Sequence, residues 1–187
     1  MELATARLRL REFTDADWPA VLAYQADPRY LRLYAWTDRS EAEVRAFVGR
    51  FVAQAAEQPR HRFQLAVVRP ETGQLIGNAG IRRDPQRPWE AELGYELAPD
   101  HWGRGYATEA AGALLAFAFG ALRLHRVVAH CVADNAASAR VLAKLGFQLE
   151  GRLRDHAYYK GRWWDELCYG LLEAEWKVNN GHRLAPS

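Results

Sequence analysis

The sequence has 187 residues, of which 49% are hydrophobic, and a formal net charge of +2. This length and apolar content suit one globular domain and exclude a highly charged disordered chain. The small net charge gives no electrostatic argument for binding nucleic acid. No apolar run approaches the roughly 20 residues that cross a bilayer, and charged residues interrupt residues 1–13, where a signal peptide needs an apolar stretch. We therefore expect a cytoplasmic protein with neither a membrane nor a nucleic-acid partner.

The two cysteines, Cys131 and Cys168, both lie in apolar, strand-like stretches. Two isolated thiols cannot form a disulfide framework, and their sequence spacing matches no zinc motif. We interpret both as core residues and expect no bound metal.

The first half of the chain predicts helices followed by antiparallel strands. Residues 6–13 alternate polar and apolar, which indicates a strand, and Thr14 caps a predicted helix over 14–27. Ser40 begins a clearer helix, since the apolar residues after it form one stripe. Strands are predicted over 62–70, 74–84 and 89–99, the first two joined by a tight turn at 71–73. The helical stripe consists of Val44, Phe47, Val48, Phe51 and Val52.

The second half alternates strands and helices. Residues 107–122 are apolar nearly all round, which indicates a buried helix, and the β-branched stretch 125–135 indicates a strand. A second helix runs from its cap at Asn135 to Gly146. Two long strands then surround a turn at Lys160–Gly161. This order predicts a mixed α/β (α+β) fold in one domain, residues 1–176, with 177–187 as a tail.

Two glycines, Gly103 and Gly105, stand directly before the predicted buried helix. Glycine allows positive φ and a close approach of the backbone to a ligand, and the first amides of a helix have no internal acceptor. With the positive end of the helix dipole behind them, the amides of residues 103–108 can bind a phosphate. A tight turn without a ligand explains the glycines equally well. The third glycine of a dinucleotide fingerprint and the lysine of a P-loop are both missing.

Two stretches, "ELGYELAPDHWGRGYATEA" and "RVVAHCVADNAASARVLAKLGFQLEGRLRD", resemble the GNAT N-acetyltransferases, specifically the branch of the ribosomal-protein acetyltransferases RimJ and RimL. The resemblance runs from about Leu8 to Leu172. It implies a central, mostly antiparallel twisted sheet of six to seven strands with about four helices. The phosphate-loop signature falls on six consecutive residues, and Trp102 replaces the usual first one: Trp102, Gly103, Arg104, Gly105, Tyr106 and Ala107.

The resemblance implies acetyl-CoA as cofactor, with its pyrophosphate on the amides of residues 103–108, Thr108 included. Its pantetheine arm would run between the strand ending at Leu97 and the strand ending near Ala133, which a bulge holds apart in this family. Backbone amides at Leu97 and Ala98 would then stabilise the developing negative charge on the thioester oxygen. Asn135 would bond the pantetheine arm, and it can also be a plain helix cap.

Acetyl transfer to an amine also needs a group that accepts a proton. Strand alternation places Glu92 and Glu96 on one face of the predicted strand 89–99, where the family often keeps its general base. We rank Glu92 first, Glu96 second and His130 third. A merely solvated sheet face is the alternative for both acids, and a packed or exposed imidazole is the alternative for His130.

The groups near the cofactor sulfur differ from the family pattern. Many members have a tyrosine seven residues after the motif asparagine, where this chain has Leu142. RimL-like members use a serine instead, which Ser138 matches, although a serine in a first helical turn can also bond the backbone. A strand glutamate of RimL-like proteins corresponds to Ala157 in this chain. This departure from the family pattern argues against carrying over the mechanism and the ribosomal substrate of those proteins.

The sequence therefore predicts an acetyl-CoA-dependent N-acetyltransferase that acts directly on a protein N-terminus or on a small-molecule amine, as a monomer or homodimer. A CoA-binding sensor of the same fold without catalysis is the alternative. The aromatic residues of the last strands and of the first half can line an acceptor cleft or belong to the core; they are Trp36, Tyr158, Tyr159, Trp163 and Trp164.

Overall fold

This computed structural model describes residues 1–180. Eight strands form one sheet in the order β1-β2-β3-β4-β5-β6-β8-β7. The chain divides into two compact units, Met1–Arg82 with Leu93–Leu114, and Arg83–Glu92 with the residues from Leu115 onward. The strands are β1 (Glu2–Ala4), β2 (Arg9–Glu12), β3 (Arg62–Arg69), β4 (Gln74–Arg83), β5 (Glu90–Leu97), β6 (Arg126–Val132), β7 (Gln148–Tyr159) and β8 (Arg162–Leu172). The α-helices are α1 (Trp18–Gln25), α2 (Pro28–Leu31), α3 (Glu41–Ala55), α4 (Tyr106–Gly120), α5 (Ala136–Lys144) and α6 (Glu173–Asn180).

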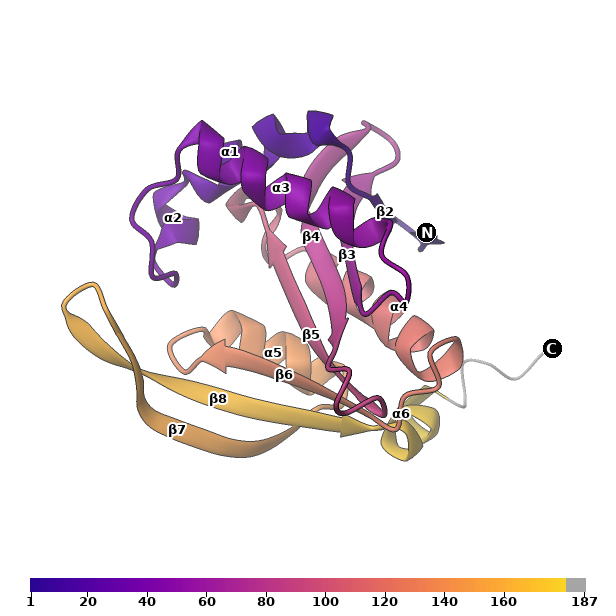
Figure 1. The fold of residues 1–187 in the computed structure, drawn as a ribbon. Coiled ribbons are helices and arrows are strands. Elements are labelled where there is room, and N and C mark those ends of the chain that lie inside the picture. Colours follow the sequence, from indigo (N-terminus) through magenta and orange to yellow (C-terminus); the bar gives the residue numbers. More distant parts are fainter. Residues whose placement is uncertain (181–187) are drawn as a thin grey trace. The chain divides into compact units, whose positions relative to one another are not determined.

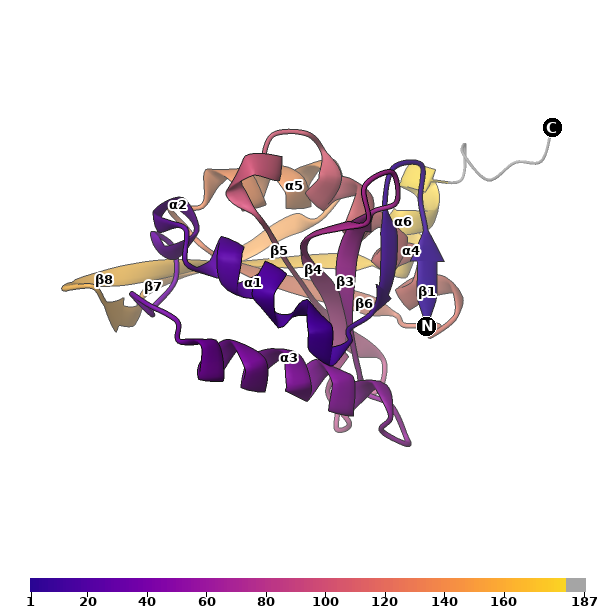
Figure 2. The ribbon, with the colours of Figure 1, turned by 90° about the horizontal axis from the view of Figure 1, so that it is seen from above.

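The first unit is an antiparallel meander covered by helices. The pairs β1–β2, β2–β3 and β3–β4 are all antiparallel, and α3 packs against β3 and against α1 (Figures 1 and 2). The predicted stripe of α3 supplies Val44 and Val48 to a core that also contains Val21 and Tyr24 of α1. Ser40 caps α3 as predicted, in a capping box with Glu43.

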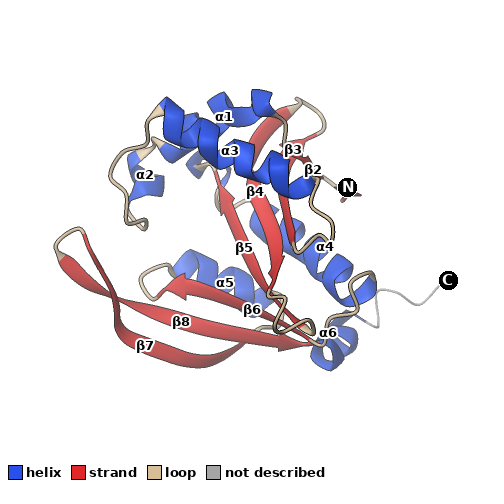
Figure 3. Cartoon of the chain, in the orientation of Figure 1, coloured by secondary structure: helices blue, strands red, loops and turns tan. Residues whose placement is uncertain are grey.

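The second unit is built on antiparallel β6, β8 and β7, to which the first three residues of β5 add in parallel register. Helix α5 packs against β6 (Figure 3). It is capped as predicted, because the Asn135 side chain accepts a hydrogen bond from the Ser138 amide and Gly146 adopts φ +90° after the helix.

The predicted α/β fold is confirmed, and residues 1–180 contain eight strands rather than six to seven and two short helices, α2 and α6, beyond the predicted ones. Strand β1 and helix α2 are four residues or shorter, too short for a periodic pattern to reveal. The helix predicted after Thr14 is a short 3₁₀ turn, Asp15–Asp17, followed by α1.

Helix α6 corrects the prediction of a tail from residue 177. Two acids stand in its first turn, where they complement the helix dipole. The Glu175 carboxylate accepts a hydrogen bond from the Leu172 amide, and Lys177 pairs with Glu173 one turn earlier. The helix also packs its Trp176 ring against Phe119, with the ring centroids 6.0 Å apart. The remainder of the predicted tail, residues 181–187, lies outside the described residues.

A buried ion pair closes the start of the first helical segment. The Asp17 carboxylate accepts hydrogen bonds from Arg11 at 2.7 and 2.8 Å and from the Thr14 amide at 2.8 Å. Burial alone would raise the pKa of Asp17, but these hydrogen bonds and the Arg11 charge lower it below its usual value. A lowered folded-state pKa contributes stability above the unfolded pKa, and this contribution is lost as the pH falls through the folded pKa.

We expect Asp17→Asn to reduce the free energy of unfolding at pH 7 by about 1–3 kcal/mol, because it leaves the Arg11 guanidinium without its charged partner. The difference from the wild type should shrink as the pH falls below about 4, since the carboxyl group of the unfolded wild type is then protonated, and it should vanish below the lowered pKa of the folded state. Urea unfolding of both proteins at pH 7 and at pH 3 measures this. A difference of the same size at both pH values would contradict the role of the charge.

Candidate active site

The glycine turn begins α4 in the first unit as the sequence predicts. Gly103 and Gly105 have φ angles of +73° and +80°, a region that L side chains rarely adopt. The Gly105 carbonyl accepts the first helical hydrogen bond, from the Glu109 amide at 3.0 Å. The amides of residues 105–108 consequently have no acceptor within the helix, and Gly105 itself is exposed. This arrangement suits the binding of a phosphate group.

Arg7 lies against this turn, and sequence reasoning did not single it out. Its guanidinium donates to the Arg104 carbonyl at 3.1 Å and lies 4.7 Å from the centre of the Tyr106 ring. Glu109 holds it in place, accepting hydrogen bonds from the Arg7 amide and Nε, both at 2.8 Å. A Cβ on Gly105 would lie 3.4 Å from Arg7 Nη2. An arginine beside an exposed turn of backbone amides adds a second kind of phosphate donor.

Charged groups of both signs lie near the turn. Burial and the nearby charges of Arg104 and Arg69 lower the pKa of His101, which stands just before the turn. Burial by itself would raise the pKa of Glu109, but hydrogen bonds from Thr5 and Arg7 lower it below its usual value, so it stays ionised at neutral pH and keeps Arg7 in place.

The end of β5 differs in part from the prediction. The Ala98 amide, expected to be an exposed donor, gives its hydrogen bond to the Ile76 carbonyl at 2.8 Å. It is therefore not free to bind a thioester oxygen, and its predicted role is wrong. A register shift lies between β3 and β4, where Val67 pairs with Gly77 and Val68 with Leu75. The role predicted for the Leu97 amide remains a prediction.

Trp102, the departure from the phosphate-loop signature, ties the turn to β5. Its indole N–H donates to the Leu97 carbonyl at 2.7 Å while the ring is 44% exposed. The side chain thus fixes the position of the turn, and the backbone amides of the turn stay available.

The Glu96 carboxylate accepts four hydrogen bonds from neighbouring side chains. Its Oε1 accepts hydrogen bonds from Tyr24, Gln25 and Asn78, and its Oε2 accepts one from Tyr30 at 2.5 Å. Burial and then the Glu96 charge raise the pKa of Tyr24 and of Tyr30 above the usual range, so both phenols remain donors. Because α1, α2 and β4 all bond to this carboxylate, the arrangement favours an anchoring role over proton acceptance.

In the second unit, Glu92 and His130 lie on one face of the sheet. Glu92 pairs in parallel register with Val128, two residues before His130 on β6. Directly paired residues share a face, and so do residues two apart on one strand. Glu92 is partly buried, whereas the His130 side chain is 37% exposed, with its Nδ1 3.7 Å from a Glu166 oxygen. The structure thus places the first and third candidates for the general base on the same face of neighbouring strands.

Ser138 stands in the first turn of α5, where its amide donates to Asn135 and its hydroxyl bonds the Cys131 thiol. Burial raises the pKa of Cys131, although the Ser138 hydrogen bond acts in the opposite direction. The helix-cap role of Asn135 is confirmed. The cofactor roles of Asn135 and Ser138 remain predictions.

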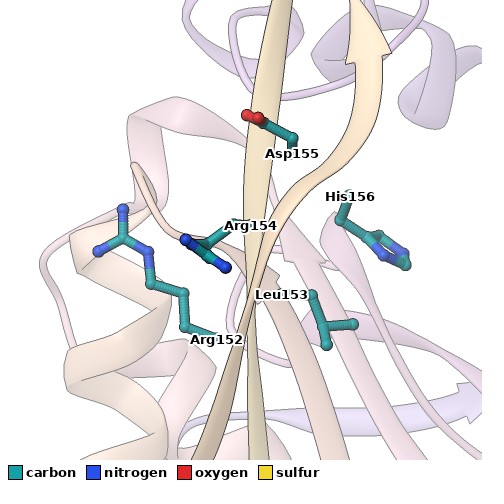
Figure 4. A pocket seen from close by; sticks show the side chains of 5 residues that line it. All are labelled: Arg152, Leu153, Arg154, Asp155 and His156. Atoms are coloured by element: carbon teal, nitrogen blue, oxygen red, sulfur yellow. The ribbon is translucent and has the colours of Figure 1, made fainter.

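A bulge in β7 changes the direction of the side chains that lie opposite Glu166. Leu153 pairs with Glu166 and Ala157 with Trp164, so β7 has extra residues between these pairs, and Asp155 adopts φ +49°. Asp165 of β8 holds the bulge, accepting from the Asp155 amide at 2.9 Å and from Arg152 Nε at 2.6 Å. Figure 4 shows the open depression here, with Leu153 and His156 on one side of the strand and Arg152 and Arg154 on the other.

The aromatic residues of the β7–β8 hairpin divide between core and surface. Trp164 is buried and stacks on Tyr159 at 4.7 Å, as a core residue does. Tyr158 and Trp163 form an exposed edge-to-face pair. In the first unit, Trp36 packs against Tyr34 next to the α1–α3 core.

The sequence profile of the acetyltransferase (GNAT) domain matches residues 7–148. The chain is 34% identical to the uncharacterised N-acetyltransferase YoaA of Bacillus subtilis over 91% of this chain and 96% of the relative. It is 26% identical to the ribosomal protein uS5-alanine N-acetyltransferase of Escherichia coli, covering 94% and 93% of the two chains. The structure of RimL, a ribosomal L7/L12 α-N-protein acetyltransferase in complex with coenzyme A, has the same fold, with a TM-score of 0.80 and 21% identity over 92% of this chain and 98% of that one.

These matches confirm the resemblance to the RimJ/RimL branch, and they cover both the glycine turn and the strand that carries Glu92. Within residues 1–180, no helix has the length and apolar composition that a bilayer crossing requires. The chain therefore belongs to the GNAT acetyltransferase family and is an N-acetyltransferase.

Proposed function

We propose that this enzyme transfers an acetyl group directly from acetyl-CoA to a primary amine. The observation that carries the proposal is the glycine turn, where two positive-φ glycines precede α4 and the amides of residues 105–108, which have no acceptor within the helix, lie beside the Arg7 side chain. These amides and Arg7 would bind the pyrophosphate of the cofactor. The solved structure of RimL contains coenzyme A, which supports the same ligand class for this chain.

In the proposed reaction, the amine nitrogen attacks the thioester carbonyl carbon, the carbon–sulfur bond breaks, and an amide and free CoA are formed. The attacking amine must lose one proton, and the departing sulfur must gain one. We assign the acceptance of the amine proton to Glu92. Ser138 and the Leu97 amide keep their predicted roles as donors to the sulfur and to the carbonyl oxygen.

Direct transfer is favoured over a cysteine intermediate. Burial raises the pKa of the Cys131 thiol and, together with the charges of Glu166 and Glu150, raises that of Cys168. Both thiols are therefore mainly protonated near pH 7, and a protonated thiol is a poor nucleophile.

The names of the relatives support a choice of acceptor class. One relative is named a ribosomal protein uS5-alanine N-acetyltransferase, and RimL is named an α-N-protein acetyltransferase. An α-amine has a reference pKa of only about 7.7–8.0. A weak base such as a carboxylate is enough for such an amine. We propose a protein N-terminal α-amine or a small-molecule amine of similar basicity as the acceptor, and a cytoplasmic location.

A turnover screen tests this function. Purified protein is incubated with acetyl-CoA and with N-terminal peptides, amino acids or polyamines, and free CoA is quantified. We expect CoA release that depends on an α-amine, and an unchanged intact mass of the enzyme. An acetylated enzyme that disappears in the double variant Cys131→Ser, Cys168→Ser would overturn direct transfer, and the absence of turnover with every amine would favour a CoA-binding module.

A further inference from the structure

We propose that His130, Glu166 and Cys168 bind a divalent zinc ion. The three side chains lie in the second unit, outside the glycine turn, and each offers one ligand atom. These nitrogen, oxygen and sulfur atoms all lie within 4.8 Å of one another. Glu166 and Cys168 lie beyond residues 7–148, the part of the chain that the family profile matches.

The strand register places the three ligands together. His130 of β6 stands directly opposite Cys168 of β8, and such cross-strand neighbours have Cβ atoms about 4.5–5.5 Å apart. Glu166 lies two residues before Cys168 on the same strand and therefore on the same face. Cys131, which follows His130, points to the opposite face of the sheet, where its thiol bonds Ser138 of α5. His130, Glu166 and Cys168 thus project together from the face of β6 and β8 that is turned away from α5.

The site has room for an ion. On β7 the residue paired with Cys168 is Gly151, and a Cβ added there would meet no atom within 4 Å. The side chains of His130 and Glu166 are 37% and 28% exposed, so an ion can reach them. A tetrahedral zinc ion needs ligand atoms roughly 3.3–3.8 Å apart, given its bonds of about 2.0–2.3 Å. Small side-chain rotations would bring the three atoms from 4.8 Å or less to that spacing.

The ligand chemistry and the local charge favour zinc. Imidazole, thiolate and carboxylate are the three ligand types that zinc binds in proteins. The ion-pair partners of Glu166 are the imidazoles of His130 and His156, at 3.7 and 3.4 Å. The charge of Glu166 acts on Cys168, and the same negative charge attracts a cation, whereas Glu150 is paired with Arg126. On binding, the Cys168 thiol releases its proton to solvent and a zinc–sulfur bond forms.

His156 acts as a positioning residue for the Glu166 carboxylate. Its Nε2 lies 3.4 Å from Glu166 Oε2, and the bulge held by Asp165 turns it to this side of β7 (Figure 4). Outer contacts of this kind orient a ligating carboxylate. A water molecule would occupy the fourth coordination position of the zinc ion, as in other sites with three protein ligands.

Calorimetric titration of tag-free, reduced full-length protein with Zn²⁺, and absorption spectra with Co²⁺, test the proposal. We expect one ion per chain and a cobalt–thiolate absorption band. His130→Ala, Glu166→Gln and Cys168→Ser should each weaken Zn²⁺ binding by at least about ten-fold, and Cys168→Ser should remove the band. His125→Ala and Cys131→Ser are matched controls that should bind within about two-fold of the wild type, because neither residue belongs to the site.

Two results would overturn the proposal: no Zn²⁺ binding by wild-type protein at concentrations that saturate ordinary protein zinc sites, or a cobalt–thiolate band that persists in Cys168→Ser and disappears in Cys131→Ser. Circular dichroism of every variant separates loss of the site from loss of the fold. The proposal does not rest on acetyl transfer, since binding is measured without acetyl-CoA or amine.

Discussion

Glu92→Gln is expected to lower kcat about 10²–10⁴-fold at pH 7 and to leave acetyl-CoA binding unchanged, because glutamine cannot accept the amine proton. The residual rate should rise with pH, as a growing fraction of the amine loses its proton without help. Steady-state kinetics with an N-terminal peptide between pH 6 and pH 9, together with acetyl-CoA titration, measure both effects.

The matched control is Glu90→Gln. Glu90 lies on the same strand and the same face, two residues earlier, and its carboxylate forms ion pairs with Arg126 and Arg87, both at 2.8 Å. We expect this variant to lose some stability and to keep kcat within a few-fold of the wild type. If Glu92→Gln retains full turnover at pH 7, Glu92 is not the base. The assignment then moves to His130, because Glu96 is engaged by four hydrogen bonds.

Gly105→Val is expected to abolish acetyl-CoA binding. Valine is strained at φ +80°, and its side chain would stand over the exposed amides and against the Arg7 guanidinium. In the wild type, a ligand at 100 times its Kd adds about 2.7 kcal/mol of stability, which for a chain of this size raises Tm by roughly 5–10 °C. We expect the variant to show no shift at the same acetyl-CoA concentration. Thermal unfolding with and without acetyl-CoA is the measurement.

Gly73→Val separates backbone strain from ligand binding. Gly73 also has a positive φ, +69°, in the turn between β3 and β4, and a Cβ there would meet nothing within 4 Å. This variant should unfold at a lower temperature than the wild type and keep the full shift with acetyl-CoA. A shift preserved in Gly105→Val, or lost in both variants, would contradict a phosphate site at the glycine turn.

Local patterns predicted most of the secondary structure for clear physical reasons. Ser40 and Asn135 cap helices because their side-chain oxygens accept bonds from amides three residues later, which is a contact within one turn. The apolar stripe of α3 and the positive φ of Gly146 likewise depend only on residues that are close together in the sequence. The short β1 and the polar α6 were missed, because neither has enough periodic apolar residues to produce a signal.

Site residues that depend on contacts distant in sequence could not be found in this way. Arg7 reaches the glycine turn through Glu109, 102 residues away, and no local pattern links the two. The engagement of the Ala98 amide by Ile76 depends on how the chain packs beside β4, so its prediction as a free donor was wrong. The four donors on Glu96 come from three separate segments.

The sequence by itself determined the order of the elements, the caps, the glycine turn and the family, because each depends on residues that are neighbours along the chain. Only the tertiary structure decided which side chains meet. The β6–β8 register sets His130 opposite Cys168, and a shift by one residue would place them on opposite faces. The β7 bulge, which Asp165 holds, turns His156 toward Glu166. Glu109 of α4 holds Arg7 against the glycine turn at the start of α4. These contacts follow from strand register and long-range hydrogen bonds, which no short stretch of sequence contains.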